Sequence, residues 1–425
     1  MHQSAGVISV GDELTLGQTL DTNSRWLSSR LTDLGVSVRR HVTIADDVHA
    51  IAEEIERFAR DFDLVIVSGG LGPTADDLTR SAMARALGEP LVEDDAALKQ
   101  VQAWFARSGR EMPQANAVQA QRPESAAMIE NRHGTAPGLF ASVHGCDVWC
   151  VPGPPTELRP MFEAAIVPQI RCSRVVVTRV LRTAGLGEST IAERLAPLMG
   201  RDRNPLVGTT ASGGVVSCRI RYEGDDGSDG NRLVDDAATE VRRLLGSYVF
   251  GESDQSLESS IVEVLATRRK TVTIVESCTG GLLAGAITAV AGSSAVFERG
   301  LVTYSDAQKT ELVAVPSWIF RRQGAVSRAC VEAMAREGLD LAKSDYCLSV
   351  SGVAGPGGGS PDKPVGTVWI CRAAADGSVD SRRFVFNGDR ETVRRRSVMA
   401  ALCMLWHRLM RSEELPLLGQ AEPSD

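Results

Sequence analysis

Short apolar runs alternate with amphipathic segments throughout the first 170 residues. The run at 64–67 is apolar at every position, whereas residues 21–34 place three leucines on one face before Gly35. The first pattern predicts a strand of a parallel sheet covered on both faces, and the second predicts a helix that ends at the glycine. Because strand and helix patterns alternate, we expect a doubly wound, three-layer α/β domain over residues 1–170.

The pattern changes between residues 171 and 252. Strand-like runs at 175–177 and 215–220 flank a helical segment, and the polar, glycine-rich stretch 224–230 predicts an exposed loop. These features predict a small α+β domain over residues 171–252.

Strand–helix alternation resumes at residue 253 and continues to residue 412. This part predicts another three-layer α/β domain, followed by a polar, loosely held tail at 413–425. The fold class expected for the chain is therefore α/β, with two three-layer α/β domains joined by a small α+β domain.

Charge and cysteine usage narrow the classes of partner and the compartment. The net charge is -8 and the isoelectric point is about 5.5, which argues against a general nucleic-acid binder. No stretch reaches about 18 strongly apolar residues, and the first ten residues lack a signal-peptide pattern, so we expect no membrane association. The 9 cysteines include no C-x-x-C pair, which favours reduced thiols in the cytoplasm over a zinc site or a disulfide framework.

A glycine-rich segment follows the strand predicted at 64–67. It contains Gly69, Gly70, Gly72 and Thr74. Open α/β sheets bind ligands at the carboxyl ends of their strands, and glycine lets main-chain N–H groups approach a phosphate closely. This loop is therefore a candidate binding site for a phosphate or pyrophosphate, although it is not a Walker loop because no G-K-[ST] follows. The alternative is a plain glycine turn before a helix.

Acidic residues accompany this segment. Asp76 and Asp77 follow the glycines, and Asp12 follows the first predicted strand. Carboxylate oxygens are suitable ligands for a hard cation such as Mg²⁺, which would neutralise a phosphoryl group during hydrolysis. The other interpretation is that these acids only stabilise the first turn of a helix through its dipole.

A serine stands at a sharp turn between a predicted buried strand and a predicted helix. Ser277 and Thr279 lie in this turn, Tyr304 and Lys309 lie five positions apart downstream, and no histidine stands in a comparable loop. A hydroxyl nucleophile needs a base, so Ser277 with Lys309 is the arrangement that the residues suggest. Lys309 can act as a base only if its pKa lies well below the ordinary value of about 10.4. The alternative is a serine that only caps a helix and a lysine on the surface.

Another glycine-rich loop, 352–359, follows the strand predicted at 346–351. Gly352 and Gly355 belong to it. Its main-chain N–H groups would suit a phosphate, but a bare glycine run is equally typical of a flexible connector.

The motifs together resemble those of the CinA (competence/damage-inducible protein A) family over nearly the whole chain. They occur in the family's order at 11–13, 21–24, 69–74, 76–79, 134–138, 152–155, 276–281, 292–294, 303–305, 324–327, 351–356 and 363–368.

The resemblance implies two activities. The N-terminal part is similar to the family's molybdopterin-binding-like domain, which is linked to ADP-ribose pyrophosphatase activity with a divalent metal of the Mg²⁺ or Co²⁺ type and K⁺; Asp12, Asp76 and Asp77 are the metal candidates. The C-terminal part is similar to nicotinamide-nucleotide amidohydrolases, which convert nicotinamide mononucleotide to nicotinate mononucleotide and ammonia without a cofactor. A homodimer in a bacterial cytoplasm is also implied.

Transferred to this chain, the resemblance makes Ser277 the amidase nucleophile, activated by Lys309 and Tyr304. Main-chain N–H groups near Thr279 and Gly280 would bind the oxyanion. Gly281, Gly352 and Gly355 are expected at the substrate, and either Thr279 or Ser294 is the candidate for a further hydroxyl.

Two alternatives remain open. One is a competence- or damage-inducible protein whose N-terminal domain binds a nucleotide or pterin without turnover. The other is an amidase whose N-terminal domain serves only for dimerisation.

Overall fold

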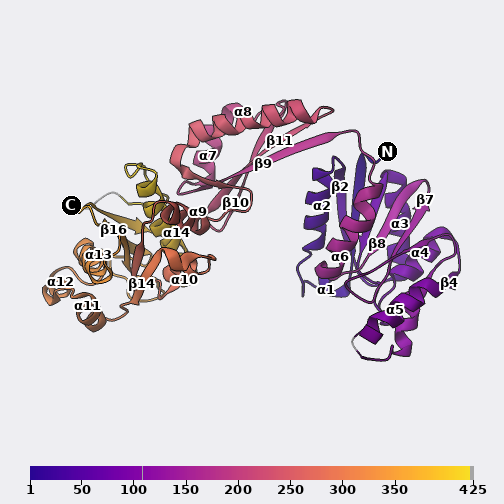
Figure 1. Ribbon diagram of the computed structural model, residues 1–425, viewed down its shortest axis with the longest axis horizontal. Coiled ribbons are helices and arrows are strands. Elements are labelled where there is room, and N and C mark those ends of the chain that lie inside the picture. The colour runs from indigo at the N-terminus through magenta and orange to yellow at the C-terminus, as the bar shows by residue number, and fades with distance from the viewer. Residues whose placement is uncertain (108, 422–425) are drawn as a thin grey trace. The chain divides into compact units, whose positions relative to one another are not determined.

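The computed structural model describes residues 1–107 and 109–421 (Figure 1). The chain forms two compact units. One comprises residues 1–177 with 222–231, and the other comprises residues 178–221 with the chain from 232 onward.

The first unit is built on a six-stranded sheet with the order β2-β1-β3-β8-β7-β6. The first four strands of this order are parallel, and the last two are antiparallel to their neighbours. The strands are β1 (Ser4–Val10), β2 (Ser37–Ile44), β3 (Leu64–Ser68), β6 (Ala127–Ile129), β7 (Gly138–Val143) and β8 (Cys146–Val151).

Helices cover both faces of this sheet, as predicted for a three-layer domain. On one face, α3 (Val48–Asp61) and α4 (Thr79–Leu87) bury their apolar sides against β1 and β3. On the other face, α2 (Asn23–Asp33) and α6 (Pro155–Met161) do the same. Peripheral elements are α1 (Asp12–Thr15), β4 (Leu91–Glu93), α5 (Asp95–Arg107), β5 (Gln121–Pro123) and the short turns η1 (Gln114–Ala120), η2 (Phe162–Ile166) and η3 (Val167–Gln169).

The second unit begins with a four-stranded sheet of order β10-β11-β9-β12. Its elements are β9 (Val175–Ala184), α7 (Glu188–Leu195), η4 (Ala196–Leu198), β10 (Leu206–Ser212), β11 (Val215–Gly224), α8 (Gly227–Leu245), η5 (Gly246–Tyr248) and β12 (Val249–Glu252). The exposed loop predicted at 224–230 is wrong in its second half, because α8 already begins at Gly227. The carboxylate of Asp226 accepts hydrogen bonds from the N–H groups of Ser228 and Asp229 and so caps the helix within this polar stretch.

The other α/β domain has a five-stranded sheet of order β14-β13-β15-β16-β17. The strands are β13 (Val272–Glu276), β14 (Phe297–Val302), β15 (Tyr346–Gly352), β16 (Thr367–Ala374) and β17 (Val379–Val385). The strands β14, β13 and β15 are parallel, so their carboxyl ends lie at one edge of the sheet. The strands β16 and β17 complete it in antiparallel orientation.

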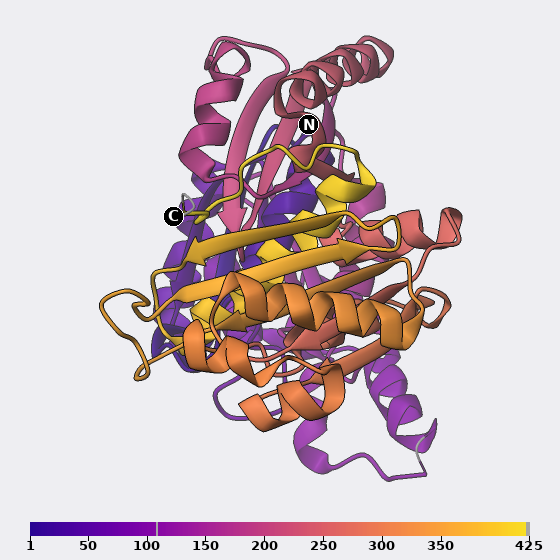
Figure 2. The same cartoon turned by 90° about the vertical axis from the view of Figure 1, so that its left-hand side faces the viewer.

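Two helical layers cover this sheet. One contains α9 (Leu257–Thr267), α10 (Leu282–Thr288) and α14 (Arg390–Leu409). The other contains α13 (Arg328–Ala342), which lies in front of the strands in Figure 2, with α11 (Asp306–Val313) and α12 (Ser317–Arg322) beside it. The turn η6 (Ser293–Ala295) precedes β14. None of the helices in the described residues is long and apolar enough to span a membrane.

Residues 413–421 are packed, so the prediction of a loose tail is wrong for this part of it. Leu417 is buried, and the hydroxyl of Tyr248 donates to the carbonyl of Pro416 at 2.8 Å. Gln420 forms a β-bridge with Phe384. Burial of the apolar side chain of Leu417 stabilises the packing of this otherwise polar segment against the protein.

Candidate active sites

Ser277 and Lys309 meet at the carboxyl edge of the C-terminal sheet. Ser277 directly follows β13, and Lys309 belongs to the first turns of α11. The ammonium Nζ of Lys309 lies 3.1 Å from Oγ of Ser277. Both side chains are buried, with Lys309 only 1% exposed. The structure therefore brings together the two residues that the sequence suggested as nucleophile and base.

The surroundings of Lys309 lower the pKa of its ammonium group. Burial lowers the pKa of Lys309 below its ordinary value, while the carboxylate of Asp306, 4.0 Å from Nζ, acts in the opposite direction. Nζ also donates to the carbonyl oxygens of Thr303 at 3.0 Å and Tyr304 at 3.3 Å. These two carbonyls fix the side chain so that it points at Ser277.

Tyr304 contacts Lys309 through its main chain and not through its hydroxyl. The side chain is 58% exposed, and Arg390 Nη2 donates to the hydroxyl at 2.8 Å. Arg390 also donates to the carbonyl of Gly355 at 2.9 Å. The arginine thus joins the segment before α11 to the glycine-rich loop after β15.

The loop between β13 and α10 is held from inside by a carboxylate. Glu276 is 1% exposed and accepts hydrogen bonds from three main-chain N–H groups at the start of the helix. The donors are Gly281 at 3.1 Å, Leu283 at 3.0 Å and Ala284 at 2.9 Å. Gly280 and Gly281 adopt φ values of 59° and 95°, which glycine reaches without steric cost. The signal for this role in the sequence is an acid at the end of a predicted strand, followed by a short loop and a predicted helix, but this role was not predicted.

Arg394 of α14 donates hydrogen bonds to the same loop between β13 and α10. Its Nε donates to the carbonyl of Cys278 at 3.2 Å, and its Nη2 donates to the carbonyl of Thr279 at 2.7 Å. No local pattern predicts this contact, because it joins residues that are 115 and 116 positions apart. The hydroxyl of Thr279 is buried without a hydrogen-bond partner among the described residues. Burial raises the pKa of the Cys278 thiol to about 12, so this cysteine is not a thiolate nucleophile at neutral pH.

The remaining predicted substrate residues are not all close to this pair. Ser294 is exposed on η6, and no hydrogen bond among the described residues joins it to Ser277 or Lys309. Gly352 ends β15, where a Cβ atom would lie 2.7 Å from the side chain of Val368. Gly355 is buried with φ at 84° and presents its carbonyl to Arg390.

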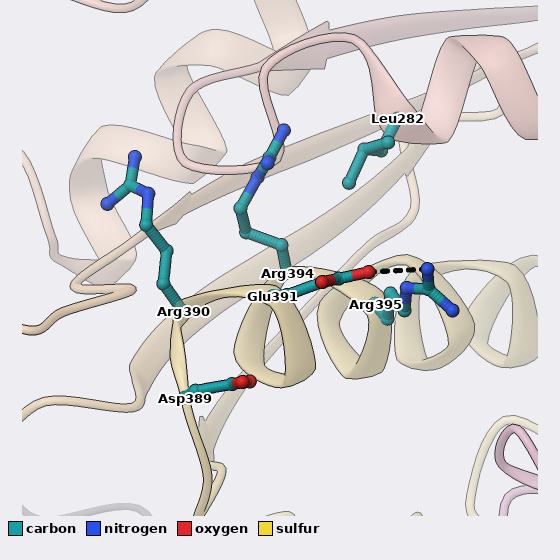
Figure 3. A pocket seen from close by; sticks show the side chains of 6 residues that line it. All are labelled: Leu282, Asp389, Arg390, Glu391, Arg394 and Arg395. Atoms are coloured by element: carbon teal, nitrogen blue, oxygen red, sulfur yellow. Dashed lines mark ion pairs between the residues drawn. The ribbon is translucent and has the colours of Figure 1, made fainter. Parts of the chain in front are cut away.

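A cavity of about 430 Å³ opens at the start of α14, beside Leu282 (Figure 3). Three arginines and two acids from the first turns of the helix line it: Asp389, Arg390, Glu391, Arg394 and Arg395. Glu391 pairs with Arg395 at 2.5 Å, and Asp389 caps the helix through the N–H of Thr392. The side chain of Arg394 extends toward the loop after β13.

In the first unit, the predicted glycine loop lines a cavity of about 390 Å³ at the carboxyl ends of β1, β3 and β8. Gly69 and Gly70 have positive φ values, and a Cβ atom at Gly69 would lie 2.3 Å from the carbonyl oxygen of Val10. Among the described residues, the N–H groups of Gly70 and Leu71 have no hydrogen-bond acceptor. The structure therefore places a glycine-dependent loop with unpaired N–H donors at the predicted edge of the sheet.

Two side chains shape this loop. Arg80, buried in α4, donates to the carbonyls of Leu71 and Gly72, and burial lowers the pKa of its guanidinium to about 10. Asp77 accepts from the N–H groups of Gly72 at 2.7 Å and Thr74 at 2.8 Å. Both oxygens of Asp77 are thus used by the loop itself. Arg80 was not among the predicted site residues.

The acidic residues lie near the loop but not as the predicted set of three. Asp12 is paired with Asp46, since each main-chain N–H donates to the other's carboxylate. Glu13, Asp46 and Asp76 line the cavity, whereas Asp12 is absent from its lining. Burial raises the pKa of Asp46, and the neighbouring acids raise it further. In the described part of the chain, no group of three or more His, Cys, Asp and Glu residues is arranged to hold a metal by itself. Asp46 follows the carboxyl end of β2, which is the signal that would have identified it.

Three sequence families match successive parts of the chain. Residues 6–172 match "Probable molybdopterin binding domain", residues 178–251 match "Damage-inducible protein CinA KH domain", and residues 254–409 match "CinA C-terminal domain".

Similar proteins extend over nearly the same length. One relative, from Moorella thermoacetica, carries the name of a competence-damage inducible protein. It is 40% identical to this chain over 409 residues, and the match covers 95% of this chain and 98% of the relative. A "CinA-like protein" from Geobacter metallireducens is 39% identical over 408 residues, with the same coverage. Among solved structures, a competence/damage inducible protein from Agrobacterium tumefaciens is 39% identical, covers 35% of this chain and 91% of its own, and has a TM-score of 0.35.

Proposed function

Because this chain belongs to the CinA family, we propose that its C-terminal domain hydrolyses nicotinamide mononucleotide to nicotinate mononucleotide and ammonia. The observation that supports this amidase most strongly is the buried pair of Ser277 Oγ and Lys309 Nζ, 3.1 Å apart. A carboxamide resists water, so its hydrolysis requires an activated nucleophile, an oxyanion site and a proton donor for the leaving nitrogen.

In the proposed mechanism, neutral Lys309 accepts the proton of Ser277 as Oγ attacks the carboxamide carbon. The carbonyl oxygen takes up the negative charge. Lys309 then donates the proton to nitrogen, the carbon–nitrogen bond breaks and ammonia leaves, with the nicotinoyl group bound to Oγ as an ester. A water molecule then gives a proton to Lys309 and attacks the ester carbon. The bond from this carbon to Oγ breaks, Lys309 returns the proton to Oγ, and nicotinate mononucleotide leaves. The carbonyls of Thr303 and Tyr304 keep the amine directed at Oγ throughout.

The cavity at the start of α14 offers a place for the nucleotide's phosphate. Arg395 is already paired with Glu391, and Arg394 is used by two carbonyls. Arg390 also has two partners, Gly355 and Tyr304, but it is exposed at the cavity, and a guanidinium can donate to a phosphate while keeping such contacts. We therefore expect Arg390 to bind the phosphate. In this scheme the hydroxyl of Tyr304 positions Arg390, and its carbonyl orients Lys309.

Product identification tests this proposal directly. The full chain is incubated with nicotinamide mononucleotide, and ammonia and nicotinate mononucleotide are quantified by mass spectrometry. We expect equimolar formation of both by the wild type and a rate at least about 10²-fold lower for Ser277→Ala. Turnover by Ser277→Ala above about a tenth of the wild-type rate would exclude the serine mechanism, and an inactive wild type would exclude the activity.

For the N-terminal domain we propose hydrolysis of the pyrophosphate of ADP-ribose. Two observations favour it: within the described residues the N–H groups of Gly70 and Leu71 have no acceptor and can bind an anion, and burial, together with the neighbouring acids, raises the pKa of Asp46. The carboxylates of Glu13, Asp46 and Asp76 have the oxygen chemistry that a divalent metal of the Mg²⁺ or Co²⁺ type prefers, and such a metal would neutralise the phosphoryl oxygens. K⁺ is a further proposed cofactor of this site.

Incubation with ADP-ribose, with and without each cation, separates turnover from mere binding. Release of AMP and ribose phosphate that depends on the cation would support the pyrophosphatase. Binding without products would favour the nucleotide- or pterin-binding alternative.

We also propose that the protein is a cytoplasmic homodimer whose partners are small nucleotides and not nucleic acid. Light scattering after size-exclusion chromatography tests the dimer.

A further inference from the structure

We propose that Arg394 is a positioning residue of the amidase site. By holding the carbonyl oxygens of Cys278 and Thr279, it directs the N–H of Thr279 to the oxygen that becomes negatively charged during attack. The inference rests on the proposed amidase activity and adds to it one specific oxyanion donor and the side chain that orients this donor.

Most N–H groups around Ser277 are already used. Glu276 takes those at the start of α10. The N–H of Ser277 donates to Val350 at 3.0 Å, and that of Gly280 donates to Ser277 at 3.1 Å. Within the described residues, the N–H groups of Cys278 and Thr279 have no acceptor. The N–H groups of Thr279 and Gly280 were the expected oxyanion donors. Of these two, only the N–H of Thr279 is available, because the N–H of Gly280 already donates to Ser277.

Peptide geometry links Arg394 to this free donor. In a trans peptide the C=O and the following N–H point in opposite directions. The carbonyl of Cys278 is held by Nε of Arg394 at 3.2 Å, so the N–H of Thr279 is turned away from the arginine. The carbonyl of Thr279 is held by Nη2 at 2.7 Å, which turns the N–H of Gly280 toward Ser277. One guanidinium thus sets the orientation of both peptide groups that follow Cys278.

The chemistry of the contact favours arginine specifically. A planar guanidinium presents several donors in a fixed fork, whereas an ammonium is a single point on a flexible stem. Two neighbouring carbonyls match the fork, and a lysine at the same position could not hold both in one geometry. No ion pair of Arg394 occurs within 4.0 Å among the described residues, so the two carbonyls are its principal partners.

Kinetics of Arg394→Ala and Arg394→Lys test the inference, with Arg396→Ala as the matched control. Arg396 lies on the same helix, is exposed and also donates to a main-chain carbonyl, that of Asn387 at 2.9 Å. We expect kcat of Arg394→Ala to fall by about 10- to 100-fold, since deleting one oxyanion donor outright costs about 10²–10³-fold. KM should change by less than about threefold. Arg394→Lys should restore little of kcat, added guanidinium chloride should restore part of it in Arg394→Ala, and the control should match the wild type.

Other outcomes overturn the inference. A rise in KM with kcat unchanged would mean that Arg394 binds the substrate's phosphate directly from the cavity that it lines. Unchanged kinetics, or a loss of kcat that guanidinium does not relieve, would likewise exclude the positioning role. If Arg394→Ala does not fold by thermal unfolding, Arg394→Lys supplies the kinetic comparison, because it keeps the charge and the chain length.

Sulfonylation of the serine separates this inference from the proposed function. Phenylmethylsulfonyl fluoride modifies an activated serine, and intact-mass spectrometry reports the adduct. The amidase itself would be refuted if the wild type does not turn over nicotinamide mononucleotide and also forms no adduct that depends on Ser277. A wild type that does both, with an Arg394→Ala variant modified at the same rate, would refute only the role of Arg394.

Discussion

Arg390 donates a hydrogen bond to the hydroxyl of Tyr304 at 2.8 Å, although Lys309 is the residue that the sequence paired with this tyrosine. The tyrosine reaches Lys309 only through its carbonyl, at 3.3 Å. Any variant that keeps the main chain in place should therefore leave the orientation of the lysine intact.

Tyr304→Phe should reduce kcat/KM several-fold, mainly by raising KM, because Arg390 loses the group that positions it for the substrate's phosphate. Steady-state kinetics at several pH values checks this. The acidic limb of the kcat profile should stay where it is in the wild type. A shift of that limb would show that the hydroxyl acts on Lys309 after all.

Ser277→Ala should lower kcat by at least about 10²–10³-fold, the cost of losing a single oxyanion donor in other acyl-transfer enzymes. Affinity for nicotinamide mononucleotide, measured by isothermal titration calorimetry, should change little, because the hydroxyl acts mainly in the transition state. A variant that keeps more than about a tenth of wild-type turnover would point to Thr279 or a directly activated water as nucleophile.

The lowered pKa of Lys309 makes activity depend on pH in a defined direction. The amine accepts the serine proton only when it is neutral, so kcat should fall as the pH drops through its pKa in the folded protein. Stability gives an independent check. Between the lowered folded pKa and the ordinary value, the unfolded state binds more protons, so the contribution of Lys309 to the free energy of unfolding rises with pH.

Urea unfolding of the wild type and of Lys309→Met, compared across this pH window, measures that contribution. The wild type should gain stability relative to the variant by up to about 1.4 kcal/mol per pH unit. A constant difference between the two proteins over the window would mean that the pKa of Lys309 is not lowered.

Asp46→Asn and Asp77→Asn should affect the N-terminal site in different ways. Removing the charge of Asp46 should raise the metal concentration needed for ADP-ribose cleavage, because this carboxylate lines the cavity beside Glu13 and Asp76. Asp77→Asn should lower activity at every metal concentration, since Asp77 accepts hydrogen bonds from the N–H groups of Gly72 and Thr74. Metal titrations of each variant distinguish the two effects, and the amidase activity serves as the internal control. Equal loss of both activities would indicate unfolding.

Leu417→Ala should destabilise the second unit by about 2–3 kcal/mol, the lower part of the range for truncating a buried leucine. The side chain is 5% exposed. Leu418→Ala is the matched control, because Leu418 is 57% exposed and its truncation should cost little. Thermal unfolding of both variants measures the difference, and equal melting temperatures would show that the segment contributes nothing.

The strands and the two loops that bear the sites could be predicted because their signals are local. The run at 64–67 is apolar throughout, and the glycines after β3 and β13 mark turns that only glycine adopts easily. Ser277 and Lys309 were paired by their residue types, and both follow parallel strands whose carboxyl ends must lie side by side.

The contacts that complete the sites were beyond such reasoning. Arg390 and Arg394 come from a helix more than eighty positions away from the tyrosine and the loop that they contact. Nothing in their own neighbourhood distinguishes them from the exposed Arg396. Similarly, the capping carboxylate of Asp226 overrides a composition that is typical of a loop. Long-range pairing and single capping bonds depend on the folded structure and leave little trace in a local pattern.

Two arginines, the buried Arg80 at the glycine loop and the partly buried Arg394 at the serine loop, affect how each loop binds its ligand. Both hold main-chain carbonyls in the free protein, so neither loop has to lose conformational freedom when a nucleotide arrives. The hydrogen-bonded amides of these loops, such as those of Gly72 and Gly280, should consequently exchange slowly before ligand is added and change little afterwards. Loops fixed in this way cannot act as gates. Control over access to Ser277 would then rest with more exposed groups such as Tyr304, whose side chain can move without disturbing the serine or its base.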